Sequence, residues 1–170
     1  MHSEDLAGIR IGVLTVSDKG SRGEREDRGG PAIRETIAAR GGAVEVSRIV
    51  PDESEQIAAA LREMADDLSL DAVLTTGGTG LSPRDVTPQA TLSVIDYQVP
   101  GLAELMRNTG LQKTPFAALS RQVAGVRHRT LIVNLPGSPK AVQEGLEVVL
   151  PLLTHAVSTL RGDVGDHART

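Results

Sequence analysis

The segment Thr75–Gly80 (TTGGTG) carries the residue types needed to hold a phosphate group. Three of its last four residues are glycines, so the backbone can approach an anion closely and turn its N–H groups toward it. Arg84 can neutralise phosphate, and Asp85 can hold Mg²⁺, which prefers hard oxygen ligands together with bound phosphates. The glycines fit a tight turn between a strand and a helix equally well, and Asp85 also fits a helix cap near Thr87. No Gly-Lys-Ser/Thr follows, so the segment is not a P-loop.

Two further loops offer groups for an anion. Leu135–Lys140 (LPGSPK) begins a helix beside Ser138 and Lys140, and a helix N-terminus attracts negative charge. Ordinary capping explains Ser138 as well. Ser17–Arg28 contains four cationic residues, but four acidic residues lie among them, so the default interpretation is a solvated, mobile loop.

Other kinds of catalysis find little support in the chain. The four histidines have no metal-ligand spacing, cysteine is absent, and no Gly-x-Ser-x-Gly nucleophile motif occurs. Ser120 has no obvious base beside it. Loops that bind phosphates and a metal held by aspartate are typical of phosphoryl or nucleotidyl transfer, in which positioning and charge neutralisation supply most of the rate.

The composition narrows the class of protein. The 170 residues suit one domain, 1–170, and the absence of cysteine fits a reducing compartment. Met1–Asp5 is polar and no apolar run reaches the roughly 20 residues that span a bilayer, so we predict a cytoplasmic protein without membrane contact. A net charge of −4 and only two aromatic residues, Tyr97 and Phe116, argue against binding to nucleic acid.

Hydrophobic patterning predicts strands and helices that alternate in the first half of the chain. Pro31 suits the first position of a helix that ends at Gly41-Gly42, and Glu53–Leu68 carries one apolar stripe at helical spacing. A further helix should begin near Thr87-Pro88. The predicted strands are short and rich in apolar and β-branched residues: Ile9–Val16, Val44–Val50 and Asp71–Thr75.

The second half is predicted to contain a helix over Leu102–Arg107, then two strands and two helices. Ser138 should cap the first of these two helices with Pro139 at its first position, and Pro151–Leu160 should form a separate final helix. Gly162–Thr170 is expected to be a flexible polar tail. The two strands, joined by a tight turn, are Leu119–Val126 and Thr130–Leu135.

These elements indicate a single three-layer α/β domain with a mostly parallel central sheet, because strands alternate with amphipathic helices. The late pair of strands indicates one antiparallel edge. In such sheets ligands bind beyond the carboxyl ends of strands. The loops after Val16, Thr75 and Leu135 should therefore meet, within a core that extends over about residues 9–161.

Six motifs follow one another along the chain: Val13–Asp18 (VLTVSD), Val50–Asp52 (VPD), Leu74–Gly80 with Arg84–Pro88, Leu119–Arg121 (LSR), Ala124–Arg127 (AGVR) and Asn134–Pro139 (NLPGSP). Together they resemble the molybdopterin-binding family, which includes MogA- and MoaB-type proteins and the gephyrin G domain. The likeness extends from about Ile9 to Arg161, and the ordered set is far more specific than any one of its motifs.

The resemblance implies a homotrimer whose subunits bind molybdopterin, a pterin dithiolene with a terminal phosphate. Enzymes of this family transfer AMP from MgATP to that phosphate, release pyrophosphate and pass the product to a separate molybdenum-insertion protein. A phosphate oxygen is already anionic near neutral pH, so such a reaction needs little help from a general base. The absence of catalytic His, Cys or activated Ser agrees with this chemistry.

The resemblance also assigns roles to single residues. Asp52 and Asp85 match acidic positions used for metal binding and catalysis. Ser120 matches a serine implicated in substrate binding, and Asp18 a position where a nucleotide or pterin contact is plausible. The phosphate-binding positions are Thr76, Gly77, Gly78, Thr79, Gly80 and Arg84 in one loop and Pro136, Gly137 and Ser138 in another.

The main alternative is a non-catalytic molybdopterin carrier or scaffold of the same fold. Such a protein would need the glycine loop but not the metal-holding carboxylates, so the presence of Asp52 and Asp85 favours the enzyme. A molybdenum-insertion enzyme would carry further domains. If the glycine loop holds phosphate, Gly78→Val should weaken substrate binding while folding suffers only modestly.

Overall fold

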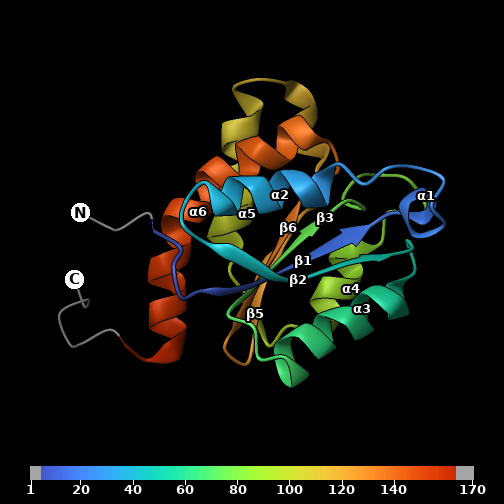
Figure 1. The fold of residues 1–170 in the computed structure, drawn as a ribbon. Coiled ribbons are helices and arrows are strands. Elements are labelled where there is room, and N and C mark those ends of the chain that lie inside the picture. The colour runs from blue at the N-terminus through green and yellow to red at the C-terminus, as the bar shows by residue number, and fades with distance from the viewer. Residues whose placement is uncertain (1–4, 164–170) are drawn as a thin grey trace.

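A computed structural model describes residues 5–163 as one α/β domain around a six-stranded sheet with the strand order β2-β1-β3-β6-β5-β4 (Figure 1). Four neighbouring strands are parallel: β2 (Ala43–Val50), β1 (Arg10–Val16), β3 (Ala72–Thr76) and β6 (Thr130–Leu135). The last two strands run antiparallel at one edge: β5 (Ala124–Arg127) and β4 (Tyr97–Gln98). The predicted fold class is confirmed.

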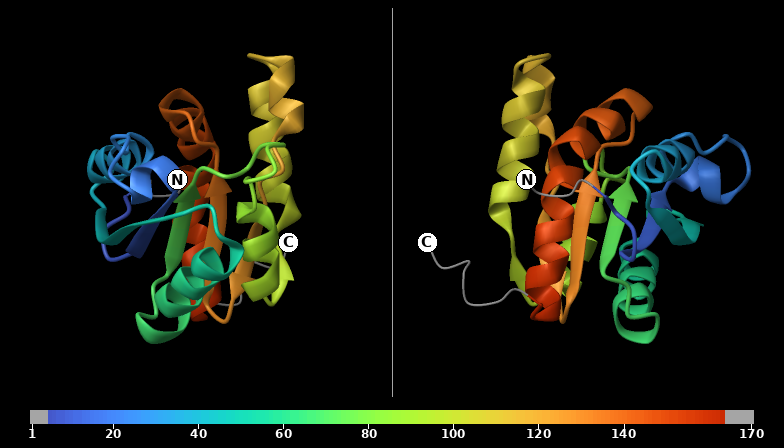
Figure 2. Two further views of the ribbon diagram at one scale, coloured as in Figure 1. Left: turned by 90° about the vertical axis from the view of Figure 1, so that its right-hand side faces the viewer. Right: turned by 60° about the vertical axis from the view of Figure 1, so that its left-hand side comes forward.

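Helices cover both faces of the sheet (Figures 1 and 2). One face packs against α2 (Gly29–Ala38), α5 (Pro100–Leu111) and α6 (Pro139–Arg161). The other face packs against α3 (Ser54–Arg62), the π-helical turn η1 (Glu63–Asp67) and α4 (Thr87–Val94). The short helix α1 (Asp18–Ser21) and the 3-10 helix η2 (Pro115–Leu119) lie in connections.

The central strands are apolar on both faces because both faces are covered. Ile11 and Val13 of β1 belong to the core beneath α2 and α6, whereas Leu14 and Val16 belong to the core beneath α3 and α4. Full burial of such a side chain contributes about 1.5–3 kcal/mol. This explains why the strands read as continuous apolar runs rather than as alternating ones.

The prediction of two final helices is wrong, because α6 is continuous from Pro139 to Arg161 with Pro151 inside it. A proline in a helix interior removes one hydrogen bond and typically costs about 3 kcal/mol. The buried face of α6 continues on both sides of Pro151, from Val149 to Leu153, so packing on the sheet offsets that cost. Ser138 caps this helix as predicted, accepting from the N–H of Ala141.

The prediction of a strand over Leu119–Val126 is also wrong for its first half. Thr114 begins η2 instead, its hydroxyl accepting from the N–H of Phe116, and the strand starts only at Ala124. The first predicted helix starts at Gly29 rather than Pro31, because the Asp27 carboxylate accepts from Gly30 N–H.

Several other elements also differ from their predicted bounds. The helix predicted over Leu102–Arg107 extends over all of α5, and α1, η2 and β4 were not expected. Gly162 ends α6 in a left-handed conformation. The rest of the predicted flexible tail, residues 164–170, and residues 1–4 of the polar N-terminal segment lie outside the described residues. Within residues 5–163, no helix is long and apolar enough to cross a membrane.

Candidate active site

The loops after β1, β3 and β6 meet as predicted, and they enclose a cavity of about 670 Å³ at the carboxyl ends of these strands. The segment after α1 forms a further wall. We call this space the large cavity. Its lining comprises Thr15–Ser17, Gly20, Arg25–Gly29, Asp52, Thr76–Gly78, Asp85 and Gly137–Pro139.

The glycine loop after β3 has a backbone that only glycine adopts readily. Gly77 and Gly78 have φ angles of 96° and 70°, and a Cβ atom on Gly77 would lie 2.3 Å from the carbonyl oxygen of Val16. A Cβ atom on Gly78 would lie 2.2 Å from Thr87 Oγ1. The expectation that Gly78→Val leaves folding largely intact is therefore wrong.

Hydrogen bonds hold the glycine loop against the loop after β6. Thr76 Oγ1 donates to the carbonyl of Pro136 at 2.7 Å, and Gly77 N–H donates to the carbonyl of Leu135 at 3.3 Å. The N–H groups of Gly78, Thr79 and Gly80 donate no hydrogen bond to any of residues 5–163. Gly77 and Gly78 line the large cavity, so the N–H of Gly78 is a donor available to an anion there.

Two carboxylates, Asp52 and Asp85, lie in the wall of the large cavity. Asp52 Oδ2 accepts from the N–H of Asp18 at 2.8 Å, and Asp85 Oδ2 accepts from the N–H of Ser82 at 3.0 Å. Burial raises the pKa of Asp52, and the negative charges of Asp18 and Asp85 add to the rise. A cation in the large cavity would relieve this repulsion.

Asp85 does not cap α4, so the structure excludes the alternative that the sequence left open. Val86 precedes the first residue of α4, and no side chain caps that helix. The Asp85 carboxylate instead closes a turn with Ser82, before the helix begins. A capping requirement therefore does not explain an acid at this position.

The two carboxylates fit a magnesium ion. Asp52 Oδ1 and Asp85 Oδ1 accept no hydrogen bond from residues 5–163, so each keeps one free oxygen. In that part of the chain no group of three or more His, Cys, Asp or Glu side chains is arranged to hold a metal. Mg²⁺ commonly binds through one or two carboxylates and completes its shell with water and substrate phosphates, which matches this donor set.

Asp18 and Arg84 pair with each other next to the large cavity. Arg84 donates to both oxygens of Asp18, from Nε at 3.0 Å and from Nη2 at 2.9 Å, and Nη2 also donates to Glu53 Oε1. Asp18 Oδ1 in turn accepts from the N–H of Asp52 at 3.0 Å. The hydrogen bonds from Arg84 hold the pKa of Asp18 below its usual range. This network fixes the backbone and side chain of Asp52.

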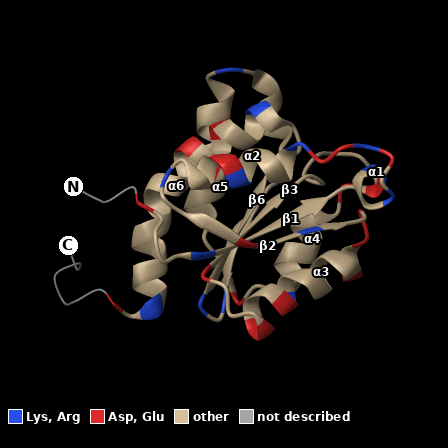
Figure 3. Ribbon diagram, viewed as in Figure 1, with Lys and Arg blue, Asp and Glu red and all other residues tan. Residues whose placement is uncertain are grey.

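Four charged lining residues were not predicted as site residues: Arg25, Glu26, Asp27 and Arg28. They belong to a loop in which acidic and basic residues are mixed (Figure 3). Asp27 anchors the loop, since its carboxylate accepts from Thr15 Oγ1 at 2.9 Å and from Gly30 N–H at 3.1 Å. This loop follows β1, and ligands bind beyond the carboxyl ends of such strands. Its many cationic residues could therefore have predicted that it lines the ligand site.

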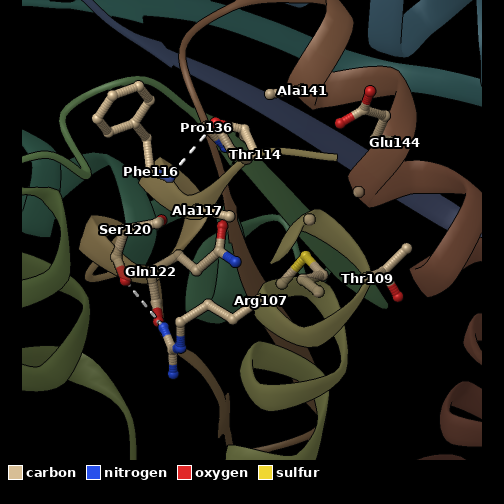
Figure 4. A pocket seen from close by; sticks show the side chains of 13 residues that line it. Arg107, Thr109, Thr114, Phe116, Ala117, Ser120, Gln122, Pro136, Ala141 and Glu144 are labelled. Atoms are coloured by element: carbon tan, nitrogen blue, oxygen red, sulfur yellow. Dashed lines mark hydrogen bonds between the residues drawn. The ribbon is translucent and has the colours of Figure 1, made fainter. Parts of the chain in front are cut away.

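A second cavity of about 250 Å³, the small cavity, lies between α5, η2 and the start of α6 (Figure 4). Pro136 lines it, whereas the next residue, Gly137, lines the large cavity, so the two spaces adjoin at the loop after β6. Its lining is mostly apolar: Met106, Arg107, Thr109, Gly110, Thr114, Phe116, Ala117, Ser120, Gln122, Pro136, Ala141, Glu144 and Gly145.

Two buried polar atoms in the wall of the small cavity have no hydrogen-bond partner among residues 5–163. Ser120 Oγ and Gln122 Oε1 are inaccessible to solvent and hydrogen-bond to none of residues 5–163. A buried polar group left unpaired typically costs about 1–3 kcal/mol. The Arg107 guanidinium positions both residues by donating from Nη1 to their carbonyl oxygens, at 3.1 and 3.0 Å. Gln122 was not predicted, although a Gln within an otherwise apolar stretch could have indicated it.

The predicted site residues thus fall into three groups. Thr76, Gly77, Gly78, Asp52, Asp85, Gly137 and Ser138 line the large cavity. Ser120 and Pro136 line the small cavity. Asp18, Thr79, Gly80 and Arg84 line neither: Thr79 is buried, and Arg121 Nε donates to the carbonyl of Gly80.

Comparisons with known proteins agree with this geometry. The molybdopterin adenylyltransferase of Helicobacter pylori is 45% identical over 157 residues, which cover 91% of this chain and 89% of that one. The Escherichia coli molybdopterin adenylyltransferase is 47% identical over 143 residues, covering 83% of this chain and 73% of that one. The crystal structure of the molybdopterin biosynthesis enzyme MoaB from Thermus thermophilus superposes with a TM-score of 0.86 at 60% identity, over 91% of this chain and 97% of that one.

The family profile described as a probable molybdopterin-binding domain matches residues 12–155. That range contains every residue that lines the two cavities. The chain belongs to the molybdopterin-binding family, as its motifs predicted.

Proposed function

We propose that this protein transfers AMP from MgATP to the terminal phosphate of molybdopterin, with release of pyrophosphate, as a step of molybdenum cofactor biosynthesis. The observation that supports this most strongly is the pair of adjoining cavities. One is large, carries carboxylates and cations and has the glycine loop in its wall; the other is small and mostly apolar. The names of relatives at 45–47% identity point to the same activity.

The two cavities suit the two substrates. ATP would lie in the large cavity, with its phosphates near the N–H of Gly78, the N-terminus of α6 at Ser138 and the side chains of Arg25 and Arg28. Molybdopterin would place its ring in the small cavity and its terminal phosphate near Gly137, where the two spaces adjoin.

The reaction requires little beyond alignment and charge neutralisation. An oxygen of the molybdopterin phosphate forms a bond to the α-phosphorus of ATP. The bond from that phosphorus to the oxygen bridging to the β-phosphate breaks, and pyrophosphate leaves with the electron pair. Because the attacking oxygen is already ionised, no general base is needed. Helix and loop N–H groups preoriented toward the phosphates lower the barrier without reorganising.

Asp52 and Asp85 would hold the magnesium ion through their free oxygens, and the ion would neutralise charge on the ATP phosphates. Asp18 and Arg84 support this pair from behind rather than contacting substrate, since Asp18 N–H fixes Asp52 Oδ2. In the cell, we propose a cytoplasmic homotrimer that passes its product to a molybdenum-insertion protein.

The test is to incubate the purified protein with molybdopterin, MgATP and inorganic pyrophosphatase under anaerobic conditions and to separate the products. We expect one adenylylated molybdopterin and two inorganic phosphates for each pyrophosphate released and cleaved. Tight binding of molybdopterin without any adenylylated product would instead identify the protein as a carrier or scaffold.

A further inference from the structure

Gln122 presents a buried amide whose oxygen has no partner in the described part of the chain. The residue is only 3% exposed, lies two positions before β5 and lines the small cavity. Its Oε1 atom is inaccessible to solvent and accepts no hydrogen bond from residues 5–163. Figure 4 shows the amide in the middle of the lining residues, between Ala117 and Arg107. The amide thus places an unpaired acceptor, with the amide donor beside it, in the wall of the small cavity.

We infer that Gln122 is the residue that recognises the pterin ring of molybdopterin, by paired hydrogen bonds to the edge of that ring; this inference rests on the proposed function. The pyrimidinone half of a pterin carries a ring N–H next to a ring carbonyl. A glutamine amide complements such an edge: its oxygen accepts from the ring N–H while its nitrogen donates to the carbonyl. A glutamine reads adenine in DNA by the same paired geometry.

The surroundings of Gln122 suit a flat bicyclic ring. Met106, Ala117 and Gly145 supply apolar wall, and a ligand site typically combines such walls with a few placed polar groups. Ser120 Oγ, which also lies buried in the wall of the small cavity and pairs with none of residues 5–163, offers one further hydrogen bond. A ring held here leaves its phosphate-bearing end free to reach Gly137 past Pro136.

Adenine has a comparable donor and acceptor edge, so the nucleobase of ATP is the competing ligand for Gln122. The charged groups decide between the two. The carboxylates Asp52 and Asp85 line the large cavity together with Arg25 and Arg28. The two charged residues that line the small cavity are already engaged, Arg107 with main-chain carbonyls and Glu144 with Lys113, so the triphosphate and its metal belong to the large cavity. With the nucleotide there, the small cavity is left for the pterin.

The fold itself gains nothing from the Gln122 amide. Replacing an unpaired buried polar group by an apolar group of similar shape is neutral or stabilising. Gln122→Met keeps the length and unbranched shape of the side chain but removes both hydrogen-bonding atoms. Loss of ligand binding without loss of stability is therefore the expected pattern for a recognition residue, and a structural residue would show the opposite pattern.

The experiment titrates molybdopterin anaerobically into the wild-type protein, Gln122→Met and the control Gln89→Met, which makes the same change at an exposed position of α4. Bound and free molybdopterin are separated, and each is quantified by pterin fluorescence after oxidation. We expect Gln122→Met to bind molybdopterin about 10- to 100-fold more weakly, as for the loss of two neutral hydrogen bonds, with ATP affinity and melting temperature maintained. Gln89→Met should match the wild type.

Unchanged molybdopterin affinity in Gln122→Met would overturn the inference, and so would a selective loss of ATP affinity, which would assign Gln122 to the nucleobase. If Gln122→Met does not fold, Gln122→Glu serves instead, because it keeps the shape and the acceptor but removes the donor; it too must weaken molybdopterin binding. Adenylyl transfer by the wild type is measured separately. A protein that forms no product yet depends on Gln122 for molybdopterin would refute the proposed activity and leave this inference standing.

Discussion

The large and the small cavity differ in how their polar groups are satisfied. Around the large cavity the charged side chains hold one another: Arg84 joins Asp18 and Glu53, Asp18 fixes Asp52, and Asp27 ties its loop to β1 and α2. In the small cavity Ser120 Oγ and Gln122 Oε1 stay unpaired. The charged side chains around the large cavity are thus held in position before substrate binds. The two buried hydrogen-bonding atoms of the small cavity remain available to a ligand.

This difference has a physical reason. Aligning two anionic phosphates requires cations and dipoles that are already in place, because any reorganisation would add to the barrier. Discrimination between neutral rings instead comes from buried polar groups that remain unpaired when the wrong ring binds. Changes in the large cavity should therefore act mainly on turnover and ATP, and changes in the small cavity mainly on molybdopterin.

The largest effect is expected for Asp85→Asn. The substitution keeps the shape and can keep the hydrogen bond from Ser82 N–H, but it removes a charge that we assign to the metal. Loss of such a preorganised charge costs about 3 kcal/mol, or roughly 100-fold in turnover. Molybdopterin affinity and melting temperature should stay close to those of the wild type. The control is Asp67→Asn, at an exposed position on η1. Near-normal turnover of Asp85→Asn would exclude the metal role.

Gly137→Ala should come next. A Cβ atom there would lie 3.5 Å from Gly77 Cα, an ordinary contact, so the fold accommodates it. The added methyl group would nevertheless occupy the point where the two cavities adjoin and displace one phosphate. We expect turnover to fall by about 10-fold or more, since small misplacements of reacting groups are costly. Gly101→Ala, where a Cβ atom meets nothing within 4 Å, is the control. Equal kinetics in both variants would argue that the phosphates meet elsewhere.

A smaller effect is expected for Asp27→Ala. It removes the acceptor for both Thr15 Oγ1 and Gly30 N–H, and so loosens the loop that bears Arg25 and Arg28. Losing a capping carboxylate of this kind costs about 1 kcal/mol, so KM for ATP should rise about fivefold while KM for molybdopterin stays the same. Asp27→Asn retains an acceptor for Gly30 N–H and should lie close to the wild type. A rise in KM for molybdopterin alone would contradict the assignment of this loop to the nucleotide.

The smallest effect concerns stability and its pH dependence. Burial raises the pKa of Asp52 in the folded protein, so its ionisation at neutral pH lowers the free energy of unfolding. Asp52→Asn should therefore raise the melting temperature at pH 7, and the gain should vanish as the pH falls below the ordinary Asp pKa of about 3.9.

Asp18→Asn is the matched comparison, because the hydrogen bonds from Arg84 lower the pKa of Asp18. Its charge stabilises the fold above the ordinary pKa, and this contribution is lost as the pH falls through the lowered value. Asp18→Asn should lower the melting temperature at pH 7 and make no difference in strong acid. Shifts of the same sign for the two variants at pH 7 would contradict this account of the pair.

The layers of the fold were predictable from sequence, whereas the boundaries set by tertiary contacts were not. Apolar runs and helical stripes specified β1, β3, β6 and α3, because burial on both faces leaves a direct pattern. Pro151 predicted a break in the last helix, yet its packing on the sheet overrides the local preference. The strand predicted from Leu119 failed because Thr114 and Pro115 start a helical turn instead.

The site followed the same rule. Residues adjacent in sequence to a strand end, such as Gly77, Gly78 and Ser138, were found, because the sheet brings strand ends together. The pairing of Asp18 with Arg84 joins residues that are 66 positions apart and has no local pattern. Gln122 lies at the small cavity because α5 and η2 pack around it, and Arg25 lies at the large cavity because Asp27 anchors its loop. Neither position follows from the local sequence.

The most direct test of the two-cavity account is a crystal structure of the protein with adenylylated molybdopterin bound. We predict that the pterin ring lies in the small cavity against Gln122 and Ser120, that the adenylate lies in the large cavity beside Gly77 and Gly78, and that the linked phosphates pass Gly137. The account would be contradicted by a complex with the adenine ring against Gln122, or with both halves of the ligand in the large cavity.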